Sequence, residues 1–464
     1  MTTHRILIRG GYVLTMDPQL GDLPAGDVLV EDDCIAAIAR DLAPGDAEVI
    51  DARGHIVMPG MVDTHRHTWQ TQMRALCANW TLNDYFNGIR LALCRAYNPE
   101  DVYVGNYIGA LEAVNAGVTT ILDFSHCNNT PMHADAALDG LAHAGIRAVF
   151  CYGFFDSGAS SFTTHDRRVA DLERISATLS PRGLLTIGVA LTEVGLIPWP
   201  DTVAQIEAAR RVGGRIAAHT GCVWGSQVCM GVREMDAQGL LGPDQVHIHC
   251  NALGDDEWAM LARANAKVSI SPETELNMGM GAPVFGKCRQ FGIKPTLSCD
   301  IVSLNSGDLF TQMRLGLAYA RFVDNDVINR QGAMPDQLSY SVRDALEWVT
   351  VNGAMACGLE SKTGSLTPGK QADVVVLGGD SFTMRPRPDP AGSVVFQATA
   401  HDVRDVMIAG KLVKRDGRLV NVDLPRVLDR AEKSASEILS RVHATAPSPL
   451  PATVANQFAA LVRR

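Results

Sequence analysis

The chain has 464 residues, with 41 Lys or Arg against 51 Asp or Glu, so its formal charge is −10. That length can hold a large catalytic domain and a smaller one, and an acidic balance argues against nucleic acid as a partner. At 46% hydrophobic and 20% charged residues, the composition excludes disorder over most of the chain and is typical of a soluble globular protein.

The N-terminal residues, MTTHRILIRGGYVLTMD, contain only a few consecutive apolar residues. This is far short of a signal-peptide core or of a membrane span of about 20 residues. We therefore expect a cytoplasmic protein with no membrane partner. The 11 cysteines form no CxxC pair, and several lie in apolar runs. Free buried thiols are expected in preference to disulfides.

Residues 1–59 read as short strands separated by turns. ILIRGGYVLT, DVLVEDDCIAAIA and EVIDARGHIVMP are broken by the turn pairs GG, GD and PG. We interpret this segment as the first part of a small β-sandwich.

Residues 60–357 change to short apolar runs that alternate with helical stretches. This α/β pattern predicts a (β/α)8 barrel, a TIM-type fold. A doubly wound sheet is the rival, but no GxGxxG follows a first strand. The eight predicted strands lie at 60–65, 117–124, 145–152, 184–191, 214–219, 245–249, 266–271 and 292–300.

The strand-rich texture returns in residues 358–420, at ADVVVLGGD and DVRDVMIAGKLVKRDGRLV. Two such segments at opposite ends of a chain predict one β-sandwich completed by both. Residues 421–464 have helical spacing, then a Pro-rich break at APSPLPA and a last short helix. We expect this helical tail to pack on the barrel or on a neighbouring subunit.

The stretch PGMVDTHRHTW, residues 59–69, places two histidines one residue apart after an apolar run. Residues i and i+2 of a strand point to the same face, so His65 and His67 can both aim into the barrel mouth. Two imidazoles there can reach one metal ion at about 2.0–2.1 Å. HxH also occurs by chance in many proteins, so the pair alone leaves both interpretations open.

Three further candidates end other predicted strands: His219 closes GRIAAH, His249 closes QVHIH and Asp300 closes TLSCD. Any one of them could be a satisfied core group. Five together at one rim are difficult to explain by packing, and a carboxylate so deep in an apolar strand needs a cation or donors. The neighbouring His247 is interpreted as a second-layer group, because His249 lies nearer the carboxyl end of its strand.

These residues resemble a known family. PGMVDTHRHTWQ resembles the signature of the amidohydrolase superfamily, and GSLTPGKQADVVVL resembles the segment that leads its chain back into the small β-sandwich. The order HxH, His, His, Asp at strands one, five, six and eight is similar to its pattern over nearly the whole chain. Within the branch of cytosine deaminase and triazine hydrolases, VDTHRHTWQTQMRA and TTILDFSHCNNTP most resemble phenylurea and thiocarbamate (molinate) hydrolases.

The resemblance implies that His65, His67, His219 and Asp300 bind one divalent metal ion. We expect zinc, with iron, cobalt or manganese as alternatives. Neutral imidazoles with one carboxylate leave residual positive charge, which lowers the pKa of bound water. Asp300 would also accept the water proton, and His249 would relay a proton or polarise a carbonyl, so these two are the catalytic candidates. A homo-oligomer is also implied.

Two departures from the superfamily pattern restrict the chemistry. In binuclear members a strand-four lysine bridges two metals, and LLTIGVALTEVG contains none, so one metal ion is the simpler inference. In the deaminase branch a glutamate follows the strand-five histidine by three residues, and here HTGC puts Cys222 at that place. Glu193, Glu273 or Glu275 could supply a substitute acid, and each could equally be structural.

Candidate substrate contacts fall at or just beyond strand ends; they are Trp69, Gln70, His126 and Tyr152. Each could instead be core or loop packing. Arg66 should point away from the barrel interior into an ion pair. Since no other Lys or Arg ends a barrel strand, a small neutral organic substrate is favoured over an anionic one.

We therefore predict an enzyme, a metal-dependent hydrolase in which metal-activated water attacks the carbonyl of a neutral amide, urea or (thio)carbamate at a C–N or related bond other than a peptide bond. The alternative is an aromatic heterocycle deaminase or dechlorinase that works without the strand-five glutamate. A non-catalytic scaffold would be expected to have lost ligands, yet all four are present.

Overall fold

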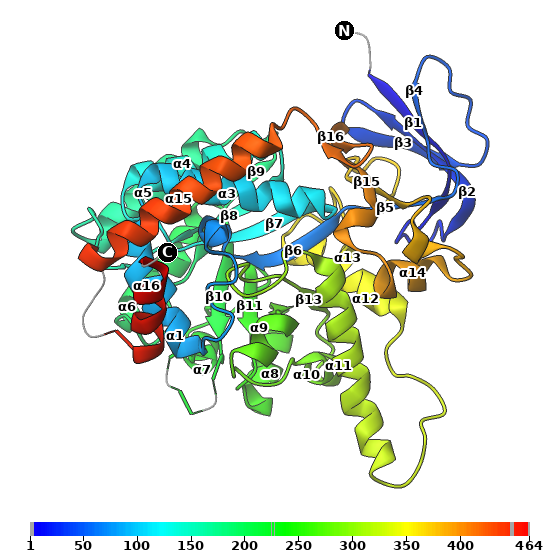
Figure 1. The fold of residues 1–464 in the computed structure, drawn as a ribbon. Coiled ribbons are helices and arrows are strands. Elements are labelled where there is room, and N and C mark those ends of the chain that lie inside the picture. The colour runs from blue at the N-terminus through cyan, green and yellow to red at the C-terminus, as the bar shows by residue number, and fades with distance from the viewer. Residues whose placement is uncertain (1–3, 224, 227, 446–449, 463–464) are drawn as a thin grey trace.

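The protein folds into an eight-stranded parallel barrel and a separate nine-stranded sheet, which confirms the predicted α/β barrel class (Figure 1). The computed structural model describes residues 4–223, 225–226, 228–445 and 450–462. Among these residues, no helix is both long and apolar enough to cross a membrane. The cytoplasmic location stays a prediction.

All eight predicted barrel strands are present and pair in chain order. The residues of β7, β8 and β11 are buried along the whole length of each strand, because helices cover the outer face of the barrel and side chains fill its interior. The strands are β6 (Met61–Arg66), β7 (Val118–Ser125), β8 (Arg147–Gly153), β9 (Leu185–Ala190), β10 (Arg215–Thr220), β11 (Gln245–His249), β12 (Lys267–Ile270) and β13 (Pro295–Leu297).

Strands β6 and β13 approach each other at their carboxyl ends, where backbone bonds close the barrel. The amide of Asp300 donates to the carbonyl of His65 at 3.0 Å, and the amide of His67 donates to the carbonyl of Asp300 at 2.8 Å. The Thr64 hydroxyl donates to the carbonyl of Leu297 at 3.0 Å. The first and last predicted ligand segments are therefore neighbours in space.

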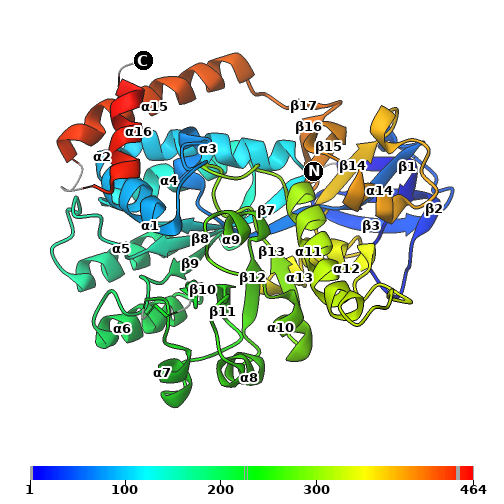
Figure 2. The ribbon, with the colours of Figure 1, turned by 60° about the horizontal axis from the view of Figure 1, so that its bottom comes forward.

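Helices surround the barrel on its outer face (Figure 2). The longest early one, α3, begins where the sequence requires it, because Asn98 and Asp101 form a reciprocal capping box and Pro99 occupies the first turn. The helices are α3 (Pro99–Asn115), α4 (Pro131–Ala144), α5 (His165–Thr178), α6 (Trp199–Arg211), α7 (Val232–Ala237), α8 (Asp255–Arg263), α9 (Pro272–Asn277), α10 (Phe285–Gln290), α11 (Leu309–Asn329), α12 (Val342–Trp348) and α13 (Val351–Ala356).

A segment between β6 and α3, which we call the cap segment (residues 81–96), departs from the barrel pattern. After η1 (Thr68–Met73) it comprises α1 (Leu82–Tyr85), the π-helix η2 (Phe86–Leu93) and α2 (Cys94–Ala96). π-Helical turns are rare and often mark functional sites.

Both ends of the chain build the small sheet, as predicted. Its strands are β1 (Arg5–Val13), β2 (Leu23–Glu31), β3 (Cys34–Ala39), β4 (Glu48–Asp51), β5 (His55–Pro59), β14 (Val374–Gly378), β15 (Val403–Ile408), β16 (Lys411–Arg415) and β17 (Arg418–Leu419). The two halves meet where β14 pairs antiparallel with β5. Short helices η3 (Phe382–Met384), α14 (Pro390–Phe396) and η4 (Ala400–Asp402) interrupt the second half.

A buried ion pair joins the sheet to the foot of the barrel. Arg147 begins β8, and its Nη2 lies 2.8 Å from Oδ1 of Asp373, just before β14. A second bond, from Nε of Arg147, reaches the other carboxylate oxygen at 3.1 Å. This pair therefore fixes the two parts at the barrel end opposite to the strand carboxyl ends.

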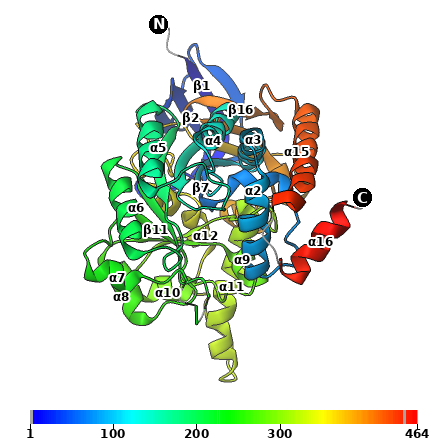
Figure 3. The same cartoon turned by 90° about the vertical axis from the view of Figure 1, so that its left-hand side faces the viewer.

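The tail forms α15 (Leu424–Thr445) and α16 (Ala452–Val462), and Figure 3 shows α15 beside α3. Ser434 and Arg441 both bond to Asp101 at the start of α3. Trp80 donates to Gln457 of α16 at 2.6 Å. The tail thus packs on the barrel, one of its two predicted locations. Residues 446–449 of the predicted Pro-rich break lie outside the described residues.

Candidate metal centre

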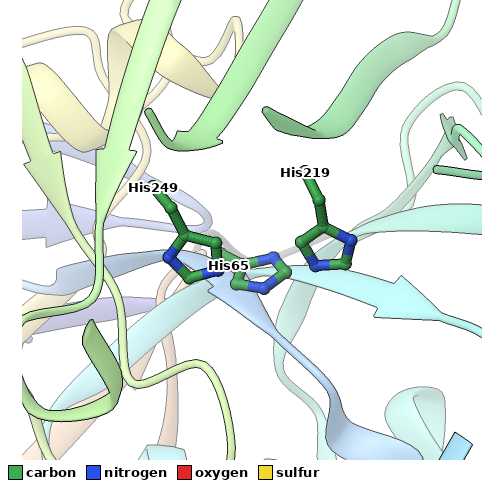
Figure 4. A group of neighbouring side chains, drawn as sticks. All are labelled: His65, His219 and His249. Carbon is green, nitrogen blue, oxygen red and sulfur yellow. The ribbon is translucent and has the colours of Figure 1, made fainter. Parts of the chain in front are cut away.

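Five of the predicted side chains meet at the carboxyl end of the barrel, the rim at which barrel enzymes place their sites. They are His65 and His67 of β6, His219 of β10, His249 of β11 and Asp300 after β13. The ring of His65 lies 5.1 Å from that of His219 and 5.8 Å from that of His249. Figure 4 shows these three imidazoles side by side, with His219 and His249 entering from neighbouring strands.

The backbone at two of these positions is strained. His249 has φ 74° and Asp300 has φ 58°. Non-glycine residues rarely adopt this left-handed region, and such strain gathers at functional sites. Strand β13 ends at Leu297, three residues before this left-handed position, and does not continue to residue 300 as predicted.

Asp300 approaches the histidines as a fellow ligand would. Its Oδ1 lies 3.1 Å from Nε2 of His65 and 3.4 Å from Nε2 of His67. Yet neither ring nitrogen of His65 has a hydrogen-bond partner among the described residues, although both are buried. Two ligands of one tetrahedral ion, each about 2.1 Å from it, lie about 3.4 Å apart. The donor set therefore fits a divalent cation.

Hydrogen bonds at Nδ1 fix the tautomers of three histidines. Nδ1 of His67 lies 3.0 Å from the Phe124 carbonyl, which can only accept, so this nitrogen carries the proton. Nδ1 of His219 lies 3.1 Å from Oε1 of Glu193. Nδ1 of His249 lies 3.1 Å from Oε1 of Glu275. Each bond leaves Nε2 for the cluster, as partners of metal-binding histidines commonly do.

Burial separates the roles of these imidazoles. It lowers the pKa of His65 to about 4 and the pKa of His67 well below its usual value, and it also lowers the pKa of His219. These three are therefore neutral near pH 7, the state that binds metals. Burial acts in the same direction on His249, but the bond to Glu275 and the charge of Asp300 outweigh it, so the pKa of His249 is raised. His249 suits proton donation better than ligation.

Ligand atoms of two overlapping groups lie within 4.8 Å of one another: His65, His67 and Asp300 in one, and His65, His219 and His249 in the other. His65 belongs to both, so the two groups adjoin one another. His247 lies outside the groups and is bonded at Nδ1 to Thr220 at 2.9 Å. The structure thus brings together the residues chosen from the sequence.

An ion pair that the sequence reasoning missed lies against this cluster. Nη1 and Nη2 of Arg90 lie 2.7 and 3.1 Å from the two carboxylate oxygens of Glu193, and the guanidinium stacks 4.1 Å over the ring of Phe155. Arg90 comes from the cap segment and ends no strand, so its only signal was a lone arginine within LNDYFNGIRLAL. Burial disfavours ionised Glu193, but the Arg90 charge and the bonds from Arg90 and His219 outweigh it and lower its pKa.

The other acid candidates are also engaged or neutral. Glu273 accepts bonds from Gln312 and Ser306 and does not border the cavity formed by the described residues. Cys222 does border it, at the place of the deaminase glutamate. The contact with Cys229, together with burial, raises the pKa of the Cys222 thiol well above its usual value. This thiol stays neutral and is unsuited to carry protons at pH 7.

The cavity above the cluster encloses about 130 Å³. Sites for drug-sized ligands usually measure about 300–1,000 Å³, so the cavity fits a small molecule. Its polar wall comprises His67, His219, His249 and Asp300 of the cluster together with Arg90 and Glu193. Its apolar wall comes from the cap segment and the loops after β10, β12 and β13: Leu82, Tyr85, Phe86, Val223, Val228, Met278, Met280 and Ile301.

None of the four predicted substrate contacts borders this cavity as the described residues form it. Trp69 and Gln70 are buried residues of η1 that lie behind the cavity lining. Gln70 donates a hydrogen bond to the hydroxyl of Tyr85 at 2.9 Å. Tyr152 bonds to Asp171 at 3.0 Å. His126 stacks on His67 at 4.5 Å behind the cluster. All four therefore lie outside this cavity, and their contact with a substrate stays a prediction. Gln70 and His126 contact residues that line the cavity.

Arg66 lies where it was expected, in a buried network away from the cavity. Its Nη1 is 3.3 Å from Oδ2 of Asp63, and its Nη2 is 2.9 Å from Oε2 of Glu112. The guanidinium therefore fastens β6 to α3 and leaves the face of the strand that carries His65 and His67 to the cluster.

Comparisons with known proteins identify the family and agree with the fold. The sequence model of the amidohydrolase family matches residues 56–413. The 5'-deoxyadenosine deaminase of Methanosarcina barkeri is 28% identical over 459 residues, which cover 95% of this chain and 99% of that protein. Among solved structures, a zinc-bound adenosine deaminase of Xanthomonas campestris superposes with a TM-score of 0.83 at 21% identity, covering 94% of this chain and 98% of that one. The zinc complex of atrazine chlorohydrolase from Arthrobacter aurescens gives 0.81 at 21% identity over 93% of this chain and 100% of that one.

Proposed function

Because the chain belongs to the amidohydrolase family, we propose that it is a metal-dependent hydrolase that cleaves a C–N or related bond beside the carbonyl of a small neutral amide, urea or (thio)carbamate. The superfamily itself is the one that the sequence resembles. The substrate class is our proposal, as is the finer likeness to phenylurea and thiocarbamate hydrolases.

His65, His67, His219 and Asp300 would hold one divalent cation, and zinc is the ion we expect. The described residues provide no hydrogen bond to the buried nitrogens of His65, and Asp300 approaches His65 and His67 at 3.1 and 3.4 Å; both observations support this set. Such a cation supplies Lewis-acid chemistry, lowering the pKa of a water ligand and polarising a carbonyl.

Asp300 and His249 would move the protons. The second oxygen of Asp300, Oδ2, points toward His249, with 3.9 Å between Oδ2 and Nε2. This oxygen can take one proton from the attacking water. His249, whose raised pKa favours its protonated form, can give one proton to the leaving nitrogen or sulfur from Nε2 while Glu275 retains the bond to Nδ1. One proton is taken and one is returned, so the pair needs no other acid.

This proposal rests on which groups at the cavity can donate a proton. A heterocycle deaminase needs a group that shuttles a proton onto a ring nitrogen, and the position of that group holds the neutral thiol of Cys222. Glu193 is fixed in its ionised form by Arg90 and cannot act as the acid. Hydrolysis at a carbonyl requires only the two proton transfers that Asp300 and His249 can perform. The small, mainly apolar cavity favours a neutral substrate with little polar decoration.

A second candidate is deamination or dechlorination of an aromatic heterocycle. It is favoured by the 28% identity with a deoxyadenosine deaminase over almost the whole chain. In that reaction His249, held by Glu275, would have to protonate the ring.

Product analysis with zinc-reconstituted enzyme separates the two. Amides, phenylureas, thiocarbamates, aminoheterocycles and chloroheterocycles would be incubated in parallel and the products weighed by mass spectrometry. We expect amine or thiol together with acid or carbon dioxide. Ammonia or chloride released from an intact ring would overturn the proposal in favour of the second candidate.

A further inference from the structure

A chain of three side chains connects the cap segment to the candidate metal centre. Arg90 of η2 binds both oxygens of Glu193, which follows β9, and Oε1 of Glu193 lies 3.1 Å from Nδ1 of His219. The side chains of Arg90, Glu193 and His219 are only 3%, 5% and 9% exposed. Each residue comes from a different part of the sequence, so folding is needed to bring the three side chains together at this site.

Stability alone does not account for this arrangement. Removing two charges from water costs several kcal/mol per ion, and an apolar pair of similar volume is often as stable as a buried ion pair or more so. The position of Glu193 offers a functional account, because a carboxylate at the far nitrogen of a metal-binding histidine fixes its tautomer and orients its ring.

We propose that Arg90 and Glu193 are positioning residues that act through His219: Glu193 holds the Nδ1 proton of His219 so that Nε2 faces the cation, and Arg90 fixes Glu193 in that orientation. The inference rests on the metal centre proposed above. It makes the cap segment part of the support of the metal centre as well as a wall of the cavity.

A second cation at the same residues is disfavoured by the charge of Arg90. Ligand atoms of His126, Glu193 and His219 also lie within 4.8 Å of one another, as a second cation would require. The guanidinium of Arg90, however, donates hydrogen bonds to both oxygens of Glu193. Nδ1 of His219 already donates a hydrogen bond to Oε1. A cation there would meet a fixed positive charge at bonding distance from its own ligand. The ion pair with Arg90 therefore prevents Glu193 from binding a second cation.

The test measures Co²⁺ binding by the metal-depleted full-length chain, by competition with a chromophoric chelator, and the visible spectrum of bound Co²⁺. Glu193→Gln keeps the shape of the side chain, but it weakens the acceptor and leaves Arg90 without its counter-charge. We expect Co²⁺ affinity to fall about 10- to 100-fold and the spectrum to shift, because outer partners of metal-binding histidines usually have effects of this size.

A double-mutant cycle tests the order of action. Arg90→Met should weaken Co²⁺ binding about as much as Glu193→Gln, and the charge-balanced double variant should be no weaker than either single variant, because both act through one bond. Arg90→Lys keeps the charge but loses the two-pronged contact, so its affinity should lie between that of the wild type and that of Arg90→Met.

Asp373→Asn is the matched control. It breaks the buried pair with Arg147, which is 3% and 0% exposed and lies at the opposite end of the barrel. This variant should lose thermal stability and keep the Co²⁺ affinity and spectrum of the wild type. Wild-type affinity and spectrum in both Glu193→Gln and the double variant, or equal losses in Asp373→Asn, would overturn the inference alone. A wild-type chain that binds no Co²⁺ would overturn the metal centre as well.

Discussion

Glu275 accepts a hydrogen bond from Nδ1 of His249 at 3.1 Å, and the same oxygen, Oε1, accepts the backbone amide of Ser271 at 2.8 Å. The Ser271 amide holds the carboxylate at the start of α9, so Glu275 meets the histidine ring in one orientation. His249 is thereby set with Nε2 toward Asp300. The bond between His249 and this buried carboxylate leads to the first prediction.

Glu275→Gln should lower kcat by about 100-fold or more, the usual contribution of a positioned general acid, with KM and metal content nearly unchanged. The amide keeps the bond but no longer favours the protonated form of His249. Steady-state kinetics and metal analysis provide the measurement. Glu273→Gln is the control on the same helix, since Glu273 bonds to Gln312 outside the cavity formed by the described residues, and it should retain near wild-type kcat. Equal losses in the two variants would contradict the role of Glu275.

Metal removal should abolish turnover and also lower the melting temperature. The neutral imidazoles of His65 and His67 and the carboxylate of Asp300 are buried together, and the described residues provide no hydrogen bond to the ring nitrogens of His65. An ion present at 100 times its Kd stabilises the folded state by about 2.7 kcal/mol. Differential scanning calorimetry before and after dialysis against a chelator measures this change, and added Zn²⁺ should restore it. His65→Ala should show the low melting temperature with and without Zn²⁺.

Cys222→Ala should retain kcat within about threefold of the wild type, because a neutral thiol contributes no proton transfer. The raised pKa of Cys222 and its place beside Cys229 support this expectation. The assay uses whichever substrate the product screen identifies. A loss of kcat of about 100-fold or more, the size of a general acid's contribution, would instead assign Cys222 the proton-carrying function of the glutamate it replaces.

The sequence was sufficient for the barrel and for the gathering of the candidate ligands at one rim, because both depend on the strand pattern; the metal-binding role of these residues stays a proposal. Buried strands are nearly continuous apolar runs, and side chains at their carboxyl ends meet at one rim, so His219 and Asp300 could be placed from position alone. Glu193 was considered as an acid but could not be assigned, because its partner Arg90 comes from a π-helix with no strand or heptad period. Substrate contact by Trp69 stays a prediction for a related reason: this residue follows a strand, and its direction depends on the turn after it.

The last prediction concerns pH and stability at Asp123 in β7. This carboxyl group is fully buried; Oδ1 accepts the amide of Thr68 at 3.1 Å, and Oδ2 has no hydrogen-bond partner among the described residues. Burial raises the pKa of Asp123 from 3.8 to about 6, against the weaker opposing effects of Thr68 and Arg66. A raised folded-state pKa means that the folded chain holds the proton more tightly than the unfolded chain.

Its contribution to stability is therefore fully present below about pH 4 and is lost as the pH rises through about 6, by up to about 3 kcal/mol. Asp123→Asn removes the titration and keeps an acceptor for Thr68. Relative to the wild type, the variant should thus become progressively more stable between pH 4.5 and 7.5. Urea midpoints of both proteins across this range measure the difference, in which any common loss of metal at low pH cancels. Parallel curves would mean that Asp123 is ionised throughout, and the buried Oδ2 would then need a donor that the described residues do not supply.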